Sequence, residues 1–272
     1  MSAKAGRTFR QLLADRMSKQ GLYDSPRYWD MKAASYEGLA RSIWPSNTYN
    51  RHWDARQRTI VDSVLGDVDG KRVADVACGT GRLSRHFAAR GARVTGLDFA
   101  PETLAAAERE TRAAGLAVDY RTWNVLEPPP DALVGAFDLV FTISCLAMAC
   151  ADVPTFDRAL AHLVSITRPG GRLLLLEPIH RSRLLRRILP LGVEAWIEHA
   201  GRAGLVLARR GGMGFVPARL ALAWRDLPDA LVGPAFDAGE RLLDLAPSLE
   251  PLADYKWLLF ERPCAPSPRA AG

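Results

Sequence analysis

Short apolar runs alternate with helical patterns through the middle of this chain of 272 residues. Val73–Val76 and Ala92–Leu97 have the pattern of two buried strands separated by a helix, and Val118–Trp123 alternates well enough to be a third strand. Phe137–Thr142 is a nearly continuous apolar run, which is typical of a strand covered on both faces. This order of elements predicts an α/β domain with a mostly parallel sheet.

The strand-and-helix pattern continues through the second half of the chain. A helical segment at Val153–Ile166 is followed by Pro169, Gly170 and Gly171, which break the helix and turn the chain into a fifth strand at Arg172–Glu177. Leu205–Arg209 and Tyr255–Glu261 have the pattern of the last two strands. An insert is therefore expected between these two strands.

These elements predict a core domain at residues 55–262 with an addition at each end. Residues 1–54 are rich in aromatic side chains and are expected to form a helical lid, although the rings would serve equally well to fasten a terminal helix to the domain. Residues 211–251 are expected to form a cap insert, whose apolar side chains fit either a small-molecule pocket or an ordinary core. Residues 263–272 have prolines, alanines and no apolar pattern, which indicates a disordered tail.

The turn from Ala77 to Gly81, between the first strand and its helix, is the most informative segment. Its two glycines let backbone N–H groups approach a ligand, and Asp98, roughly twenty positions on, can accept hydrogen bonds from ribose hydroxyls. A dinucleotide-binding turn would need a third glycine where Ser84 stands, so a pyrophosphate ligand is disfavoured. The segment predicts a nucleoside site, unless Asp98 simply lies near the start of a helix whose first turn contains Pro101.

The motif Asp75-x-x-Cys78-Gly79-Thr80-Gly81, with Asp98 closing the next strand and Pro-Gly-Gly before the fifth, resembles the class I S-adenosylmethionine-dependent methyltransferases. The resemblance covers roughly residues 55–180 and implies a Rossmann-like, doubly wound sheet of seven strands, mostly parallel. Asn124 stands where the family usually has an acidic residue for the adenine amine, and it could accept that bond only through its uncharged carbonyl. Ala100 stands where the family often has a serine, so the helix lacks a side-chain cap worth about 1 kcal/mol.

The resemblance also implies the cofactor, S-adenosylmethionine, and the residues that hold it. The glycine turn would line the methionine part, Asp98 would bind the ribose, and Phe99 would pack on the adenine. The segment Tyr28–Tyr36 is similar to the part of many small-molecule methyltransferases that folds over the cofactor. The expected cofactor-binding residues are Tyr36, Ala77, Gly79, Gly81, Asp98, Phe99, Asn124, Val125 and Thr142.

His180 is the candidate for a catalytic base. It follows the fifth strand, and ligands in open parallel sheets lie outside the carboxyl ends of the strands. A histidine also titrates near neutral pH, which suits a group that takes a proton from a hydroxyl acceptor. The alternative is that His180 only satisfies backbone groups at a turn, and that the arginines after it form the polar face of a helix.

The net charge of +6 raises the possibility of a nucleic-acid substrate. Ile143–Leu146 stands where base amino-methyltransferases have an Asn-Pro-Pro-Tyr-like motif, and the one Pro-Cys pair, Pro263-Cys264, lies in the tail rather than after the fourth strand. A small-molecule acceptor, natural-product-like or lipid-like and methylated on oxygen or nitrogen, is therefore expected. An RNA or DNA methyltransferase and a non-catalytic S-adenosylmethionine-binding protein are the alternatives.

The four cysteines, Cys78, Cys145, Cys150 and Cys264, lack Cys-x-x-Cys spacing and any nearby histidine pattern. Neither a metal site nor a disulfide framework is expected, which favours the reducing cytosol. The first seventeen residues contain five charged side chains and no apolar core, so they do not resemble a signal peptide, and no apolar run is long enough to span a bilayer. A cytoplasmic enzyme is expected, and the sequence does not define its oligomeric state.

Overall fold

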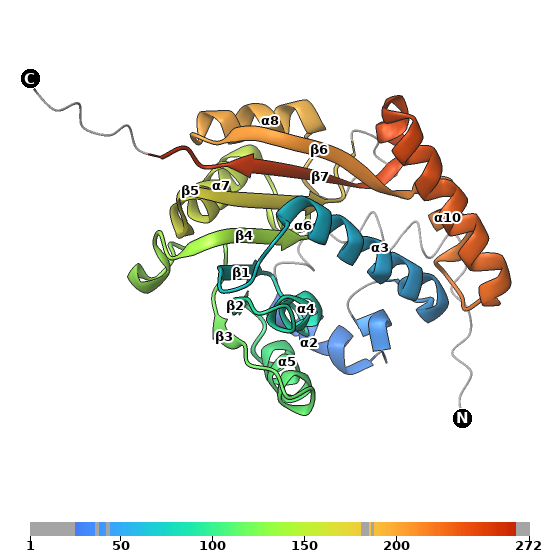
Figure 1. The fold of residues 1–272 in the computed structure, drawn as a ribbon, viewed down its shortest axis with the longest axis horizontal. Helices are drawn as coiled ribbons and strands as arrows, with labels where there is room; N and C mark the ends of the chain where they lie inside the picture. Colours follow the sequence, from blue (N-terminus) through green and yellow to red (C-terminus); the bar gives the residue numbers. More distant parts are fainter. Residues whose placement is uncertain (1–24, 36–37, 42–43, 181–184, 186–187, 265–272) are drawn as a thin grey trace, which may run out of the picture.

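The computed structural model describes residues 25–35, 38–41, 44–180, 185 and 188–264. Seven strands form one sheet in the order β3-β2-β1-β4-β5-β7-β6 (Figure 1). Their bounds are β1 Arg72–Val76, β2 Arg93–Asp98, β3 Asp119–Thr122, β4 Phe137–Ile143, β5 Thr167–Glu177, β6 Val206–Phe215 and β7 Ala253–Glu261. The expected Rossmann-like, doubly wound fold is confirmed.

The sheet is parallel from β3 to β5 and antiparallel on both sides of β7. Because β7 runs against its neighbours, its first residues lie at the edge where β1, β2, β4 and β5 end. Lys256 near the start of β7 is opposite Glu177 at the end of β5, for example. Residues close to the C-terminal end of the described chain therefore join the functional edge of the sheet.

Helices cover both faces of the sheet, which explains the unbroken apolar runs of its central strands. Alternate residues of β1 divide between two cores: Val73 packs with Leu139 and Leu174 on one face, and Ala74 packs with Val140 on the other. The first core contains side chains of α3, α4 and α10, and the second contains side chains of α7 and α8 (Figure 1).

The helices have the following bounds: α2 Pro26–Ser35, α3 Asn47–Leu65, α4 Arg82–Ala88, α5 Pro101–Ala113, α6 Leu146–Ala149, α7 Val153–Ile166, α8 Val193–Arg202, α9 Val216–Leu222 and α10 Asp229–Leu245. Short 3-10 helices lie at η1 Gly38–Arg41, η2 Asp131–Leu133 and η3 Pro247–Leu252. None of the helices in the described ranges is long and apolar enough to cross a membrane.

β5 and β6 are markedly longer than the sequence pattern predicts, whereas the other strands differ from their predicted bounds by one or two residues. β5 already begins at Thr167, where it pairs with Phe137, so the Pro-Gly-Gly segment lies within the strand at an irregularity in its register rather than before it. β6 continues to Phe215 because its pairing with β7 extends as far as Ala253. The first residues of the expected insert at 211–251 therefore belong to the sheet, and α9, α10 and η3 form the rest.

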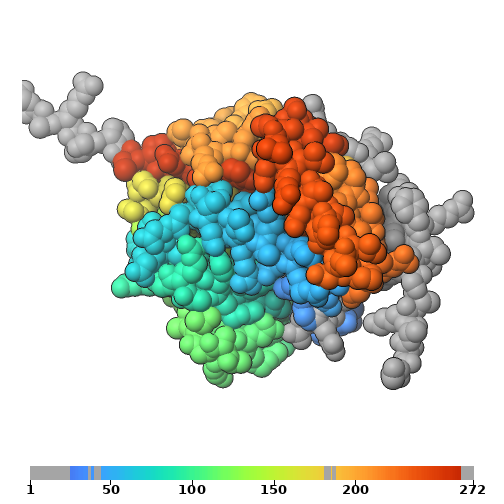
Figure 2. Space-filling model, turned by 45° about the vertical axis from the view of Figure 1, so that its right-hand side comes forward, coloured from blue at the N-terminus to red at the C-terminus, as the bar shows by residue number. Residues whose placement is uncertain are grey.

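Helix α10, which belongs to the expected cap insert, lies against α3 in the N-terminal part of the chain. Figure 2 shows the orange-red C-terminal helices against the blue N-terminal segment, and α10 contacts both α3 and β6. Glu240 of α10 holds this junction together: one carboxylate oxygen accepts hydrogen bonds from the backbone N–H groups of Gly214 and Phe215, and the other pairs with Arg56 of α3 at 3.0 Å.

The first described helix, α2, is attached to the start of α5. Ala100 supplies no side-chain cap to α5, as the sequence predicts, but Asp30 of α2 takes over that task. Its carboxylate accepts hydrogen bonds from the backbone N–H and the hydroxyl of Thr103, both at 2.9 Å. The cap that α5 lacks in its own sequence is thus supplied by a helix more than seventy residues earlier. Residues 1–24, Tyr36 and the tail at 265–272 lie outside the described residues.

Candidate functional site

The glycine turn after β1 has a backbone that few side chains tolerate. Ala77, Gly79 and Gly81 have φ values of 61°, 55° and 72°, all in the left-handed region. A Cβ added at Gly79 would meet no atom within 4 Å, whereas one added at Gly81 would overlap the hydroxyl of Tyr120. Gly81 therefore allows close packing against Tyr120, and Gly79 leaves room for a ligand to approach the backbone.

Asp98 closes β2 directly beside this turn. One oxygen of its carboxylate accepts the N–H of Gly79 at 2.8 Å, and the other accepts the N–H of Ala100 at 3.0 Å. Burial raises the pKa of Asp98, and these backbone hydrogen bonds oppose the rise. Each carboxylate oxygen can accept a further hydrogen bond, so Asp98 has the geometry to hold a vicinal diol beside the turn.

Ser84, which occupies the position of the third dinucleotide glycine, has a structural role. It is fully buried on α4, and its hydroxyl donates a hydrogen bond of 2.6 Å to the carboxylate of Asp75 in β1. Burial raises the pKa of Asp75 to about 7, against the opposing effect of the Ser84 hydrogen bond. The polar pair ties the helix after the turn to the strand before it.

The segment after β3 lies next to Asp98 through a backbone hydrogen bond, in which the N–H of Trp123 donates to the carbonyl of Asp98 at 3.0 Å. The side-chain carbonyl of Asn124 accepts the N–H of Leu126 at 3.1 Å, which leaves it one further lone pair. The Val125 carbonyl accepts a hydrogen bond from His162 Nδ1 at 2.9 Å. Phe99 is half-buried beside Asp98.

At the end of β4, Thr142 is fully buried and Ser144 has a φ of 57°. The Ser144 hydroxyl donates to the hydroxyl of Tyr255 at the start of β7. The sequence did not identify Ser144 or Tyr255 as site residues. Their meeting depends on the antiparallel direction of β7, which no local pattern reveals.

Glu177 at the end of β5 is fully buried and accepts three backbone N–H groups, those of Cys145, Leu146 and Ala147, at 2.9 to 3.2 Å. Burial raises its pKa to about 7, although the three hydrogen bonds oppose the rise. Glu177 fixes the chain that leaves β4. A carboxylate closing a buried strand, as Asp98 does, was the signal that could have identified it.

His180, one residue of α9 and two residues of β7 form a buried group that we call the cap-side polar cluster: His180, Arg219, Asp254 and Lys256. The Nε2 of His180 donates to the Asp254 carbonyl at 2.9 Å, and Lys256 Nζ lies 3.5 Å from its Nδ1. Arg219 of α9 pairs with the Asp254 carboxylate at 3.2 Å and lies over the ring of Trp44, with its guanidinium carbon 5.0 Å from the ring centroid. The sequence predicted only His180 of these four.

The two titratable bases of the cluster are held towards their neutral forms. Burial lowers the pKa of His180, and the nearby Lys256 lowers it further, while the bonds to Asp254 oppose the shift. Burial also lowers the pKa of Lys256 to about 8, against the attraction of Asp254 and Glu250. Polar residues on both sides of Tyr255 in a strand with two covered faces were the one sequence signal for this cluster.

The predicted site residues that the structure describes all come to the carboxyl edge of the sheet, around the ends of β1, β2, β3, β4 and β5. Tyr36 cannot be compared because it lies outside the described residues. In the parts of the chain that the structure describes, no group of three or more His, Cys, Asp or Glu side chains could hold a metal ion.

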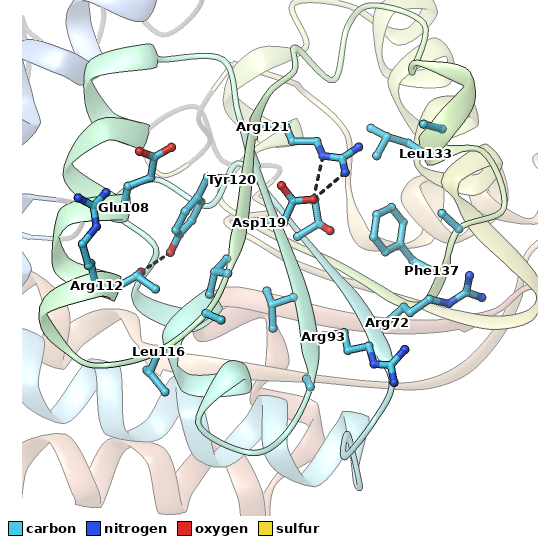
Figure 3. A pocket seen from close by; sticks show the side chains of 18 residues that line it. Arg72, Arg93, Glu108, Arg112, Leu116, Asp119, Tyr120, Arg121, Leu133 and Phe137 are labelled. Atoms are coloured by element: carbon cyan, nitrogen blue, oxygen red, sulfur yellow. Dashed lines mark hydrogen bonds and ion pairs between the residues drawn. The ribbon is translucent and has the colours of Figure 1, made fainter.

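A hollow of about 980 Å³ lies elsewhere, at the edge strand β3 (Figure 3). Arg72 and Arg93, at the amino ends of β1 and β2, belong to its lining, and the Arg121 guanidinium in it is paired with Asp119 at 2.7 Å. The hollow is open to solvent, and its lining includes neither the glycine turn nor Asp98. It is therefore not the site at which Asp98 and the glycine turn would hold a ligand.

Comparisons with known proteins agree with this geometry. A family model described as a methyltransferase domain matches residues 73–171. A ubiquinone biosynthesis O-methyltransferase of Xanthomonas axonopodis pv. citri is 32% identical over 220 residues, which cover 72% of this chain and 88% of that protein. A demethylmenaquinone methyltransferase of Thermus thermophilus is 41% identical over 124 residues, covering 44% of this chain and 53% of that protein.

The fold has solved counterparts as well. The magnesium protoporphyrin IX methyltransferase of Synechocystis PCC 6803, solved with bound SAH, superimposes with a TM-score of 0.58 at 16% identity, covering 88% of this chain and 96% of that one. The sheet order, the glycine turn and Asp98 thus define a nucleoside-binding α/β enzyme. The chain belongs to the class I S-adenosylmethionine-dependent methyltransferases of the small-molecule type, and S-adenosylmethionine is its cofactor.

Proposed function

We propose that this methyltransferase acts on a hydroxyl oxygen of a small organic acceptor, with the cofactor at the glycine turn and the acceptor on the side of the cap-side polar cluster. The observation that carries the proposal is that the glycine turn and the cap-side polar cluster both lie at the carboxyl edge of the sheet, where the Ser144–Tyr255 contact links β4 to β7. The relatives named ubiquinone biosynthesis O-methyltransferases support oxygen as the acceptor atom.

The proposed cofactor site uses the residues around the turn. Gly79 and Gly81, with Ala77, would line the methionine part, and Asp98 would accept hydrogen bonds from the ribose hydroxyls. Phe99, Asn124 and Val125 would surround the adenine, Thr142 would lie below the sulfonium end, and Tyr36 would contact the cofactor from the N-terminal segment. When bound, S-adenosylmethionine supplies a methyl group on a positively charged sulfur. The protein's contribution is then mainly to position the acceptor, which can lower the barrier by roughly 7 to 11 kcal/mol.

Removal of the Asp98 carboxylate tests this cofactor site. Asp98→Ala should weaken S-adenosylmethionine binding at least about tenfold, because a ribose hydroxyl loses a hydrogen bond to a charged acceptor. Isothermal titration calorimetry measures the affinity, and circular dichroism checks the fold. Asp119→Ala, at an exposed ion pair on the edge strand β3, is the matched control and should bind the cofactor normally. Wild-type affinity in Asp98→Ala would contradict the ribose assignment.

His180 is proposed as the base that takes the proton of the acceptor hydroxyl. Its Nε2 carries the proton that is donated to the Asp254 carbonyl, so Nδ1 holds the lone pair. The contact of Nδ1 with Lys256 is long, at 3.5 Å, and Lys256 has a shorter bond of 2.6 Å to the Ala253 carbonyl. An acceptor hydroxyl could therefore replace Lys256 at Nδ1. The lowered pKa of His180 keeps the ring neutral at pH 7, as a base requires.

The base role predicts a particular pH dependence. With an acceptor found by a mass-spectrometric screen for gain of one methyl group, His180→Ala should reduce turnover of hydroxyl compounds by about 100-fold or more at pH 7. The loss should shrink at higher pH, because the hydroxyl then ionises without help, and cofactor affinity should not change. His199→Ala, a mostly buried histidine on α8 that pairs with Asp157, serves as the control. Full activity of His180→Ala at pH 7 would leave His180 a structural residue.

A further inference from the structure

Arg219 lies in the cap-side polar cluster with much of its hydrogen-bonding capacity unused. Its side chain is completely buried, yet neither terminal nitrogen of the guanidinium has a hydrogen-bond partner among the residues that the structure describes. Its polar contact is the ion pair with Asp254 at 3.2 Å through Nε, and its other neighbour is the ring of Trp44. A buried guanidinium normally needs partners for all its N–H groups, because each one left without a partner costs about 1–3 kcal/mol.

Arg219 does not have its carboxylate partner to itself. Asp254 also lies 3.4 Å from Nε2 of His180 and attracts Lys256. The other carboxylates nearby have partners of their own: Glu240 pairs with Arg56 and accepts two backbone N–H groups, and Glu177 accepts three backbone N–H groups. Glu250 pairs with Arg210 at 3.9 Å and attracts Lys256. Within the described ranges, none of these three carboxylates accepts a hydrogen bond from the terminal nitrogens of Arg219.

A third unused donor lies in the same region. Tyr49 of α3 is fully buried, and within the described part of the chain its hydroxyl has no hydrogen-bond partner. Burial and the nearby Asp254 raise the pKa of Tyr49, so the hydroxyl keeps its proton and remains a donor. Its ring lies 5.9 Å from that of Trp53, which in turn contacts Tyr255 with 5.0 Å between ring centroids. Tyr255 is in turn hydrogen-bonded to Ser144. Ring contacts therefore connect Tyr49 with the residues at the end of β4.

We propose that the acceptor carries a carboxylate and that the Arg219 guanidinium, assisted by Tyr49 and Lys256, binds it. This inference rests on the proposed acceptor side of the site and adds the chemical class of the substrate. The two free terminal nitrogens of Arg219 form a planar pair of donors, which fits the two oxygens of a carboxylate in a bidentate arrangement. The bound anion would complete the hydrogen bonds of the Arg219 guanidinium.

The first test uses the unaltered protein with cofactor. Hydroxy acids such as caffeic acid and 4-hydroxybenzoic acid are each offered beside their methyl esters, and 4-hydroxyphenyl phosphate is included as a hydroxyl compound that has a phosphate and no carboxylate. Products are measured by mass spectrometry. We expect methylation of the free acids with at least about tenfold preference over the esters. Equal use of esters, methylation of neutral compounds alone, or preference for the phosphate would overturn the carboxylate.

The second test asks whether Arg219 is responsible. Arg219→Met should raise the KM for an acidic acceptor about 10- to 100-fold with a smaller change in kcat, and Arg219→Lys should recover part of the loss because it keeps the charge without the planar fork. Arg202→Met, at an exposed ion pair with Glu198 within α8, is the control. An unchanged KM in Arg219→Met would contradict the proposal.

Two readouts separate this inference from the proposed function. Failure of cofactor binding, or no methyl transfer to any acceptor, would contradict the function itself. Normal cofactor binding and transfer to neutral acceptors would contradict the carboxylate subsite alone. Should Arg219→Met fail to fold because Asp254 loses its partner, the comparison of acids with esters in the wild-type protein still decides the question.

Discussion

The backbone conformation of Ala77 in the glycine turn lowers the stability of the folded protein. An alanine at φ 61° has its Cβ too close to the following carbonyl, which costs about 1–2 kcal/mol, whereas a glycine adopts this conformation freely. A glycine at this position would also increase the conformational entropy of the unfolded chain, which lowers the free energy of unfolding by about 0.5–1 kcal/mol. The strain at Ala77 is the larger of the two effects.

We therefore expect Ala77→Gly to stabilise the protein by about 0.5–1 kcal/mol. Urea denaturation followed by circular dichroism measures the change as a higher midpoint with the same slope. Ala161→Gly, at an exposed position within α7, provides a control of opposite sign and should destabilise by about 0.5–1 kcal/mol. Two substitutions that both lower the midpoint would show that the left-handed backbone at Ala77 carries little strain.

The sequence is informative about residues whose role is local. Gly79, Gly81 and Asp98 follow one another at a spacing that a strand, a turn and a helix impose, so they could be predicted as a group. Arg219 could not, because one arginine in a helical pattern has no feature that distinguishes a buried ion pair from a solvated side chain. Its environment is made by Trp44 and Asp254, which lie 175 and 35 positions away along the chain.

At the scale of secondary structure, the burial of Asp75, which ties β1 to Ser84 of α4, makes stability depend on pH. The folded-state pKa of Asp75 is about 7, above the value near 4 in an unfolded chain. Between pH 4 and 7 the folded protein therefore binds more protons at this site than the unfolded chain does. Asp75 contributes stability that is fully present below about pH 4 and is lost as the pH rises through 7.

Asp75→Asn should remove this contribution. The free energy of unfolding of the variant should rise less than that of the wild type when the pH falls from 7.5 to 4.5, by up to about 4 kcal/mol. Urea titrations at several pH values measure the difference, and the asparagine carbonyl can still accept the Ser84 hydroxyl. Asp131→Asn, on the exposed η2, should keep the wild-type profile. A parallel profile for Asp75→Asn would mean that the Asp75 carboxylate is already ionised throughout this range.

Helix and strand positions were predictable where one pattern decides them. α7 has the bounds that its apolar spacing predicts, because a proline in its first turn and the start of β5 mark its two ends. The attachment of α2 was not predictable in the same way. It depends on Asp30 meeting the uncapped start of α5, and the sequence indicates that a cap is missing without indicating which helix supplies one.

At the scale of the whole molecule, the topology of one half of the sheet can be predicted from the sequence and that of the other half cannot. The cofactor half, from β1 to β5, is built from consecutive strand–helix units, so its topology follows from the order of elements and the preference for right-handed connections. The other half consists of β6 and β7. In the sheet β7 lies next to β5 and β6 lies at the edge, which is the reverse of their order in the sequence, and α9 and α10 are connected between them. No local pattern specifies that reversal, which is why most of the cap-side polar cluster was not predicted.

The central position of the last strand has a consequence for synthesis of the protein. β7 is made after every other strand, yet it is the one that joins β5 to β6. A nascent chain that has not yet released residues 253–261 from the ribosome has its cofactor half complete while the β5 edge, with Leu173–Leu176, is open. Such an apolar edge can pair with strands of other chains. Release of residues 253–261 from the ribosome is therefore the step that allows the β5 edge to pair within its own chain instead of with other chains.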